Sequence, residues 1–148
     1  MSNIPSDMNA CIPALVAKDA RAALALYEKA LGAETLHVME GQNGKVMHAS
    51  FKLGNTTLFI NDDMEMMPRH PSEGTQSTGF YYFVEDCGVA HRRALDAGMT
   101  EHFPPTDMFW GDRTSVVQDE FGYVWTIAQR VSEPTPEEMD KARKAQGF

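Results

Sequence analysis

The sequence predicts an α+β fold made of two similar modules, each with the order strand, helix, strand, strand, strand. Three observations indicate this order. An Ala-rich segment with helical spacing follows an apolar strand twice. Two segments of equal length, 45–62 and 113–130, each read as a strand, a turn and a strand. Asp19 and Asp86 precede the two helices and are separated by 67 residues, so the same order of elements occurs twice along the chain.

The first module begins with an apolar strand that ends at Val16-Ala17. Asp19 is placed to cap the following helix, because its carboxylate can accept backbone N–H groups. The apolar face of this helix has residues at helical spacing: Ala20, Leu24, Tyr27 and Leu31. Gly32 ends the helix as a left-handed cap, and a strand over 34–40 precedes the first hairpin.

The second module repeats these elements. An apolar strand ends before Asp86, which caps an Ala-rich helix that closes at Gly98. A weaker strand over 100–105 corresponds to 34–40 in the first module. The turn of the second hairpin falls at Gly122, the same offset that Gly54 has in the first hairpin.

These elements divide one domain over 1–148 into four parts. The first module covers 9–62 and the second covers 78–130. Between them, 63–77 is rich in proline, acids and small polar residues and reads as a long surface linker. The tail, 131–148, contains a helix start formed by threonine, proline and glutamate at 135, 136 and 138.

Composition limits the functions that are compatible with this fold. Apolar residues make up 43% of the 148, which is enough for a core, and no apolar run approaches the length of a membrane helix. The formal charge of −8 argues against nucleic acid as a partner. The N-terminus lacks a secretory signal, and Cys11 and Cys87 have no spacing suited to zinc or a disulfide framework. We therefore expect a cytoplasmic protein without a membrane or nucleic-acid partner.

The duplicated module resembles the vicinal-oxygen-chelate superfamily of glyoxalases, bleomycin-resistance proteins and extradiol dioxygenases. Four stretches carry the resemblance: DARAALALYEKALGAE, VMHASFKLGNTTLFIND, FWGDR and DEFGYVWTIA. In detail they are most similar to the PhnB-like subgroup. The resemblance implies a curved mixed sheet around a cavity, helices packed outside, and a homodimer.

The resemblance also implies one divalent metal, held by His, Glu or Gln side chains from four strands. The corresponding positions in this chain are near Ile12, Phe59, Gly79 and Thr126. A lone threonine hydroxyl is a poor ligand and the other three side chains offer none. We therefore expect no metal and no cofactor. The alternative is a metal bound by unusual positions or by a partner chain.

Strand alternation selects the candidate residues of the cavity wall. Along 46–53, the apolar side that starts at Met47 is predicted to meet the helices, which leaves His48 on the cavity side. His48 is the candidate catalytic acid or base, because imidazole titrates near neutral pH. Asp112 and Arg113 either orient a polar ligand group or hold their loop in place. The candidate ligand-binding residues are Ser50, Phe59, Asn61, Tyr81, Phe83, Trp110, Arg113 and Thr126.

Three functions are compatible with these features. The leading hypothesis is a metal-independent, glyoxalase- or bleomycin-resistance-like protein that holds a small, partly apolar or aromatic molecule in an enclosed cavity. It would sequester the molecule or transform it with His48 as base. The second is a metal-dependent lyase, isomerase or dioxygenase of the same superfamily. The third is an interaction module whose cavity is filled by its own side chains.

Overall fold

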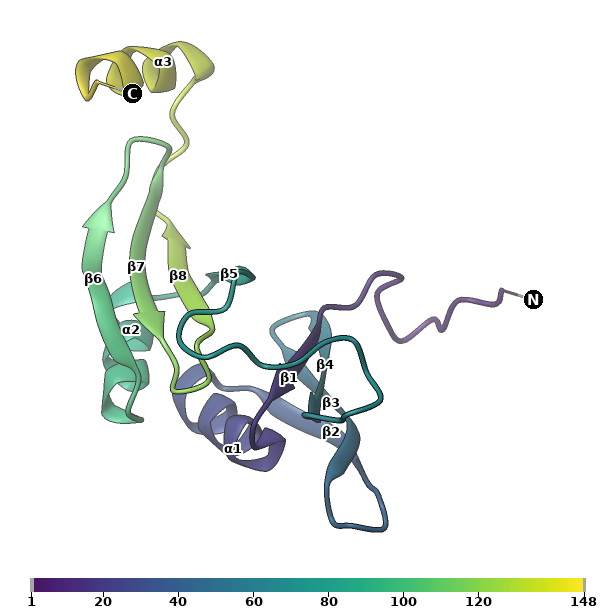
Figure 1. Cartoon of the computed structure of the whole chain (residues 1–148). Helices are drawn as coiled ribbons and strands as arrows, with labels where there is room; N and C mark the ends of the chain where they lie inside the picture. Colours follow the sequence, from purple (N-terminus) through teal and green to yellow (C-terminus); the bar gives the residue numbers. More distant parts are fainter. Residues whose placement is uncertain (1, 148) are drawn as a thin grey trace. The chain divides into compact units, whose positions relative to one another are not determined.

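The computed structural model describes residues 2–147 and divides the chain into two compact units. The first unit ends at Gln76 and the second begins at Ser77. Each contains a strand, a helix and three further strands, in the order predicted from the sequence (Figure 1). Each sheet is open, mixed and four-stranded, which confirms the α+β class and the repeated module.

The first unit has the sheet order β1-β4-β3-β2, in which β1 is parallel to β4 and the other pairs are antiparallel. Its elements are β1 (Ala14–Ala17), α1 (Ala20–Leu31), β2 (Glu34–Glu40), β3 (Val46–Leu53) and β4 (Thr56–Asp62). Helix α1 packs on this sheet, where Tyr27 meets Phe51 with ring centroids 5.7 Å apart. Both rings are fully buried and form the centre of this core.

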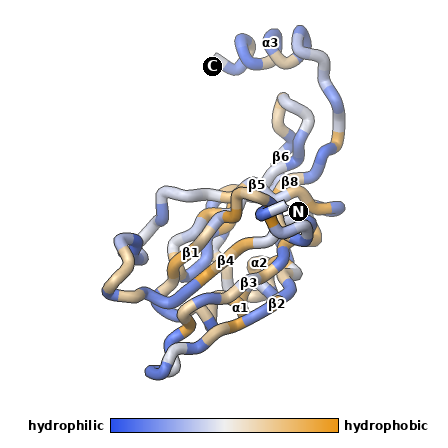
Figure 2. Tube along the Cα trace, turned by 90° about the vertical axis from the view of Figure 1, so that its right-hand side faces the viewer, coloured by the Kyte–Doolittle hydropathy of each residue, from blue (hydrophilic) through white to orange (hydrophobic). Residues whose placement is uncertain are grey.

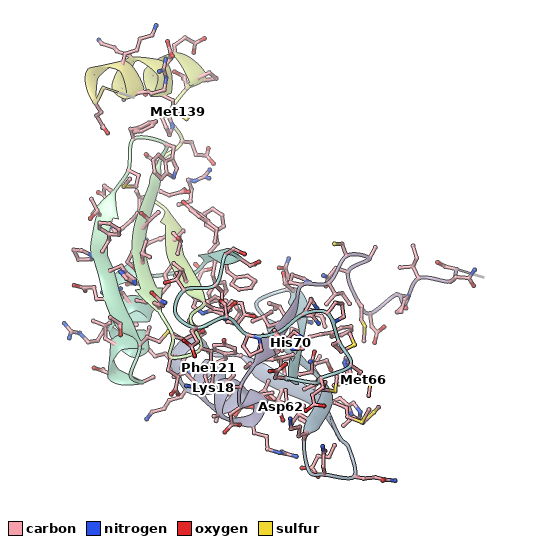
Figure 3. All side chains as sticks on the ribbon, viewed as in Figure 1. Lys18, Asp62, Met66, His70, Phe121 and Met139 are labelled. Carbon is pink, nitrogen blue, oxygen red and sulfur yellow. The ribbon has the colours of Figure 1, made fainter. Side chains whose placement is uncertain are left out.

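Helix α1 begins and ends where the sequence predicts. The Asp19 side chain accepts the Ala22 N–H at 3.0 Å, and Gly32 has a φ of 73° as the left-handed cap. A second carboxylate, Asp62 at the end of β4, also holds the helix start (Figure 3). Its two oxygens accept the backbone N–H groups of Ala20 at 2.6 Å and Val46 at 2.7 Å. Asp62 therefore ties the first turn of α1 to the start of β3.

Strand β3 contains a bulge at Met47. Met39 pairs with His48, but the next residue, Glu40, pairs with Val46, so Met47 has no partner on β2. The extra residue shifts the alternation of side chains. Val46 is consequently buried and Met47 is 46% exposed. The prediction that Met47 faces the helix is therefore wrong.

The second unit has the sheet order β5-β8-β7-β6, with β5 parallel to β8. Its elements are β5 (Gly79–Phe83), α2 (Cys87–Asp96), β6 (Thr100–Asp107), β7 (Asp112–Gln118), β8 (Val124–Arg130) and α3 (Pro136–Ala145). Val117 and Trp125 are opposite each other on β7 and β8 and are fully buried. Phe80 stacks on Trp125 with centroids 4.4 Å apart.

Two elements of the second unit differ slightly from the prediction. Helix α2 starts after the Asp86 cap but ends at Asp96, shortly before the predicted Gly98. Strand β6 runs to Asp107, beyond the predicted end, and its pairing with β7 is interrupted around Pro104-Pro105. Strand β6 is at the edge of the sheet and tolerates these prolines, because their missing N–H groups do not interrupt hydrogen bonding between central strands.

The segments that follow the two sheets differ from each other in regular structure. No helix or strand forms over 63–78, and the linker is held to the first unit by the Arg69 guanidinium, which donates to the Ala14 carbonyl at 2.8 Å. Helix α3 starts at the Thr135 cap and buries no side chain, and Figure 2 shows hydrophilic colours along much of it. Among the helices within residues 2–147, none has the length and apolarity needed to span a membrane.

Candidate functional site

The second unit carries a groove of about 440 Å³ on one face of its sheet. Strand alternation places it opposite the buried Trp125 and Val117. Three of its lining residues were predicted from the sequence: Tyr81, Trp110 and Thr126. Six were missed: Phe103, Pro104, Thr106, Met108, Thr114 and Val116.

Pairing across the four strands of the sheet builds the floor of this groove. Thr126 on β8 is opposite Tyr81 on β5 and Val116 on β7. Thr114 is opposite Thr106 on the edge strand β6. The floor is therefore fixed by the backbone ladder, whereas the turn after β6 contributes Trp110 to the wall.

A chain of hydrogen bonds holds the aromatic wall in place. The Trp110 indole N–H donates to the Tyr81 hydroxyl at 3.2 Å, and the Tyr81 hydroxyl donates to Asp112 Oδ2 at 2.6 Å. The other oxygen of Asp112 accepts Arg130 Nε–H at 2.5 Å. Asp112 and Arg130 are opposite each other at the ends of β7 and β8, so the hairpin register brings them together. Asp112 thus holds the Tyr81 side chain directly and the Trp110 side chain through Tyr81.

The same contacts set the ionisation of this cluster. Burial by itself raises the pKa of Asp112, but hydrogen bonds from Tyr81 and Arg130, together with the positive charge of Arg130, outweigh burial and hold that pKa below its ordinary value. Burial and the hydrogen bond to Asp112 raise the pKa of Tyr81. At neutral pH the cluster therefore contains a carboxylate, a phenol and a guanidinium.

Replacing Asp112 by asparagine is expected to destabilise the protein by about 2 kcal/mol at neutral pH, because two donors lose a charged acceptor. A carboxylate whose pKa is lowered by folding stabilises above its unfolded pKa, and this contribution is lost as the pH falls through the folded pKa. The stability difference between wild type and D112N should therefore shrink below about pH 4. Urea unfolding at pH 7 and at pH 3 measures it.

Asp140→Asn is the control for this experiment. Asp140 also has a pKa lowered by hydrogen bonds from Arg143 and Lys144, but it is exposed on α3. Exposed ion pairs contribute little, so D140N should leave stability unchanged at both pH values. A D112N difference that is as large at pH 3 as at pH 7 would contradict the assigned role of the carboxylate.

Two further predicted residues of the second unit do not line the groove. Phe83 is 52% exposed, with its ring centroid 5.3 Å from that of Tyr81 and 5.7 Å from the Arg130 guanidinium carbon. Arg113 alternates with Asp112 and Thr114 on β7 and so projects from the other face. Its guanidinium binds Asp107 on β6 at 2.6 Å. This pair holds the edge strand, in line with the interpretation that Arg113 fixes the loop.

The remaining predicted residues lie on the sheet of the first unit. The His48 and Phe59 rings make a T-shaped contact with centroids 4.6 Å apart, and Ser50 is opposite Phe59 on the neighbouring strand. The Asn61 side chain donates to the Asp62 carbonyl at 2.7 Å. His48, Ser50 and Phe59 therefore form one cluster, and a catalytic role for His48 stays a prediction.

A second cavity, of about 830 Å³, lies in the first unit between the β2–β3 turn and the start of the linker. Its lining includes Met47, Met64 and Met66, of which Met66 is labelled in Figure 3 and is 85% exposed. None of the candidate catalytic or ligand-binding residues predicted from the sequence lines it. Apart from Met47 on β3, its walls come from a turn and from irregular chain, unlike the strand-built floor of the groove in the second unit.

The metal implied by the family resemblance can be tested against the side chains at the corresponding positions. Phe59 packs on His48, and a side chain added at Gly79 would lie 3.5 Å from the Val124 carbonyl. Thr126 is the one residue of the four with a donor oxygen. Within residues 2–147, no group of three or more His, Cys, Asp or Glu side chains is placed to hold a metal ion. The side chains present at these four positions therefore do not fit the metal that the resemblance implies.

The missed residues depend on pairing between strands. Counting outward from the turn at Gly122 brings Asp112 opposite Arg130, so the hairpin signal in the sequence contained this pair. The position of Phe103 on the groove side follows from the irregular pairing of β6 with β7. Pro104-Pro105 indicates an interruption there, but not the register that β6 takes up on either side of it.

Comparison with known proteins agrees with this architecture. A family model described as the glyoxalase/bleomycin resistance protein/dioxygenase superfamily matches residues 11–127. An uncharacterized protein of Mycobacterium bovis is 36% identical over 140 residues, which cover 91% of this chain and 92% of that protein.

Solved structures share the fold at lower identity. TioX from Micromonospora sp. ML1 has a TM-score of 0.66 and 20% identity over 86% of this chain and 100% of its own. A PhnB protein from Bacillus cereus has a TM-score of 0.65 and 15% identity, covering 82% and 99%. The fosfomycin resistance protein FosX from Mesorhizobium loti has a TM-score of 0.63 and 12% identity, covering 90% and 97%. The chain belongs to the glyoxalase/bleomycin resistance protein/dioxygenase superfamily.

Proposed function

We propose that this protein binds a small, flat, largely apolar molecule in the groove of the second unit, without a metal at the position implied by the family. The groove volume of about 440 Å³ lies within the range of small-molecule sites. Its walls include Tyr81, Phe103 and Trp110, whose rings can stack on a planar ligand. This support is independent of any metal ligand.

The observation that carries the proposal is the support of Trp110. Its indole is fixed through Tyr81 to Asp112, which lies at 3% exposure. A wall held before the ligand arrives loses less side-chain entropy on binding.

Hydroxyls give the groove polar positions in a largely apolar lining, and one of them, that of Thr106, already donates to the Pro104 carbonyl at 2.9 Å. Thr114 and Thr126 both line it, from neighbouring strands. Few polar groups among apolar walls are the usual means by which a small-molecule site fixes ligand orientation. We therefore expect a ligand with an aromatic body and one or two hydrogen-bonding substituents.

The superfamily includes resistance proteins, and one structural neighbour is named as a fosfomycin resistance protein. Sequestration of a toxic small molecule in the cytoplasm is therefore our proposed role. The unsuitable side chains at Ile12, Phe59 and Gly79 support binding without the metal. The homodimer implied by the family resemblance stays a prediction.

Titration with the neutral probe 2-naphthamide, followed by calorimetry, tests this proposal. Wild type should bind with 1:1 stoichiometry, and Trp110→Ala should weaken binding about 5- to 10-fold because one stacking partner is lost. Met66→Ala is the control, since Met66 lines the cavity of the first unit. Binding that is lost in M66A and retained in W110A would place the ligand in the first unit and overturn the proposal.

A further inference from the structure

Arg130 is held in a fixed position at the end of β8, where Asp112 connects it to the groove residue Tyr81. Its Nε–H is bound by Asp112 Oδ1, and its guanidinium carbon lies 5.7 Å from the centroid of the Phe83 ring. Arg130 has the same strand parity as Thr126, so it projects from the groove face. A carboxylate on one edge and an aromatic ring on its face restrain this side chain.

The outer edge of the guanidinium remains open. Among the described residues, only Nε of Arg130 donates a hydrogen bond, and its two terminal nitrogens have no protein acceptor. The side chain is 50% exposed. These terminal N–H groups form a planar donor array of the kind that accepts two oxygens of one anion.

The neighbouring acids leave this edge available. Both oxygens of Asp112 are engaged, one by Arg130 and one by Tyr81. The charge of Glu133 acts on Arg130, but the two side chains form no ion pair within residues 2–147. A ligand carboxylate therefore displaces no existing contact when it reaches Arg130.

We propose that the ligand is an organic anion with an aromatic body, whose body lies in the groove and whose carboxylate binds the terminal nitrogens of Arg130. This inference rests on the proposed function, because it uses the same groove. It adds the chemical class of the ligand and the residue that selects it. The net charge of −8 opposes the approach of anions, so selection depends on this local contact.

The test compares 2-naphthoate with its neutral counterpart 2-naphthamide by calorimetry. Wild type should bind 2-naphthoate on the order of ten-fold more tightly, because charge-assisted hydrogen bonds to a held guanidinium are strong. Arg130→Gln should remove this preference, because the terminal nitrogens that bind the carboxylate are lost. Equal affinity of wild type for both probes would overturn the inference while the proposed function stands. If neither probe binds, both fail.

Two additional arms make the result specific to Arg130. Arg21→Gln is the matched control, because Arg21 is similarly exposed and pairs with Glu40 in the first unit. R21Q should keep the preference. If Arg113→Gln removes the preference and R130Q retains it, the anion binds on the other face and the inference is wrong.

A measurement on wild type covers the case in which R130Q does not fold. The Arg130 side-chain NMR signals should shift on addition of 2-naphthoate and stay unchanged with 2-naphthamide. Unchanged signals at saturating 2-naphthoate would overturn the inference without any variant.

Discussion

Replacing Trp125 by alanine is expected to lower the free energy of unfolding by about 3–5 kcal/mol, which is the usual cost of removing a large buried aromatic side chain. Trp125 is 0% exposed and lies opposite Val117 in the core of the second unit. Phe80 stacks on its ring at 4.4 Å, so this neighbour also loses contacts. Its indole N–H donates to Asp119 Oδ2 at 3.0 Å, and the substitution removes that donor.

Trp125→Phe separates the two contributions. Phenylalanine keeps an aromatic ring in the core, while Asp119 keeps its bonds from the backbone N–H groups of Phe121 and Tyr123. W125F should therefore cost clearly less than W125A. Urea unfolding followed by far-UV circular dichroism measures both, since the tryptophan signal changes in the variants. A W125A protein no less stable than W110A would contradict this account, because Trp110 lies at the groove wall.

Most of the fold could be predicted because its signals are local. Asp19 and Gly32 mark the ends of α1 through capping chemistry that involves only neighbouring residues. Because the two modules are similar, each element found in one module predicts the corresponding element in the other. Trp125 alternates with Thr126, so strand parity places it on the face opposite the groove, where it is fully buried.

The errors occur where alternation is interrupted. Met47 reads as a buried position because the pattern along β3 is regular in the sequence, but the bulge is a property of the pairing with β2. The irregular pairing at Pro104-Pro105 likewise depends on the partner strand. Register between strands is therefore the information that the local pattern does not contain.

The candidate site shows the same division. Tyr81, Trp110 and Thr126 were selected by strand parity or by the aromatic turn, and all three line one groove. Arg130 was missed, because its significance depends on Asp112, which is eighteen residues away. Arg113 was chosen as a candidate because it follows Asp112 directly in the sequence. Successive residues of a strand face opposite sides of the sheet, so Arg113 projects away from the groove.

Gly111→Ala is expected to destabilise the protein by about 3 kcal/mol, because it combines backbone strain with a steric clash. Gly111 has a φ of 100°, a conformation that favours glycine. A Cβ added there would lie 2.3 Å from the Ser132 carbonyl oxygen. That backbone cannot move freely, since the N–H groups of Val131 and Ser132 both donate to the Gly111 carbonyl, at 2.9 and 3.1 Å.

Gly98→Ala is the matched control. Gly98 has a similar φ of 107°, but an added Cβ would meet no atom within 4 Å, so G98A retains only the strain of about 1–2 kcal/mol. The difference between the variants in urea unfolding isolates the clash with Ser132. Because Gly111 follows Trp110 directly, G111A should also weaken 2-naphthamide binding, whereas G98A should not. If G111A is as stable as G98A and binds as tightly, the chain leaving β8 does not fix the groove wall.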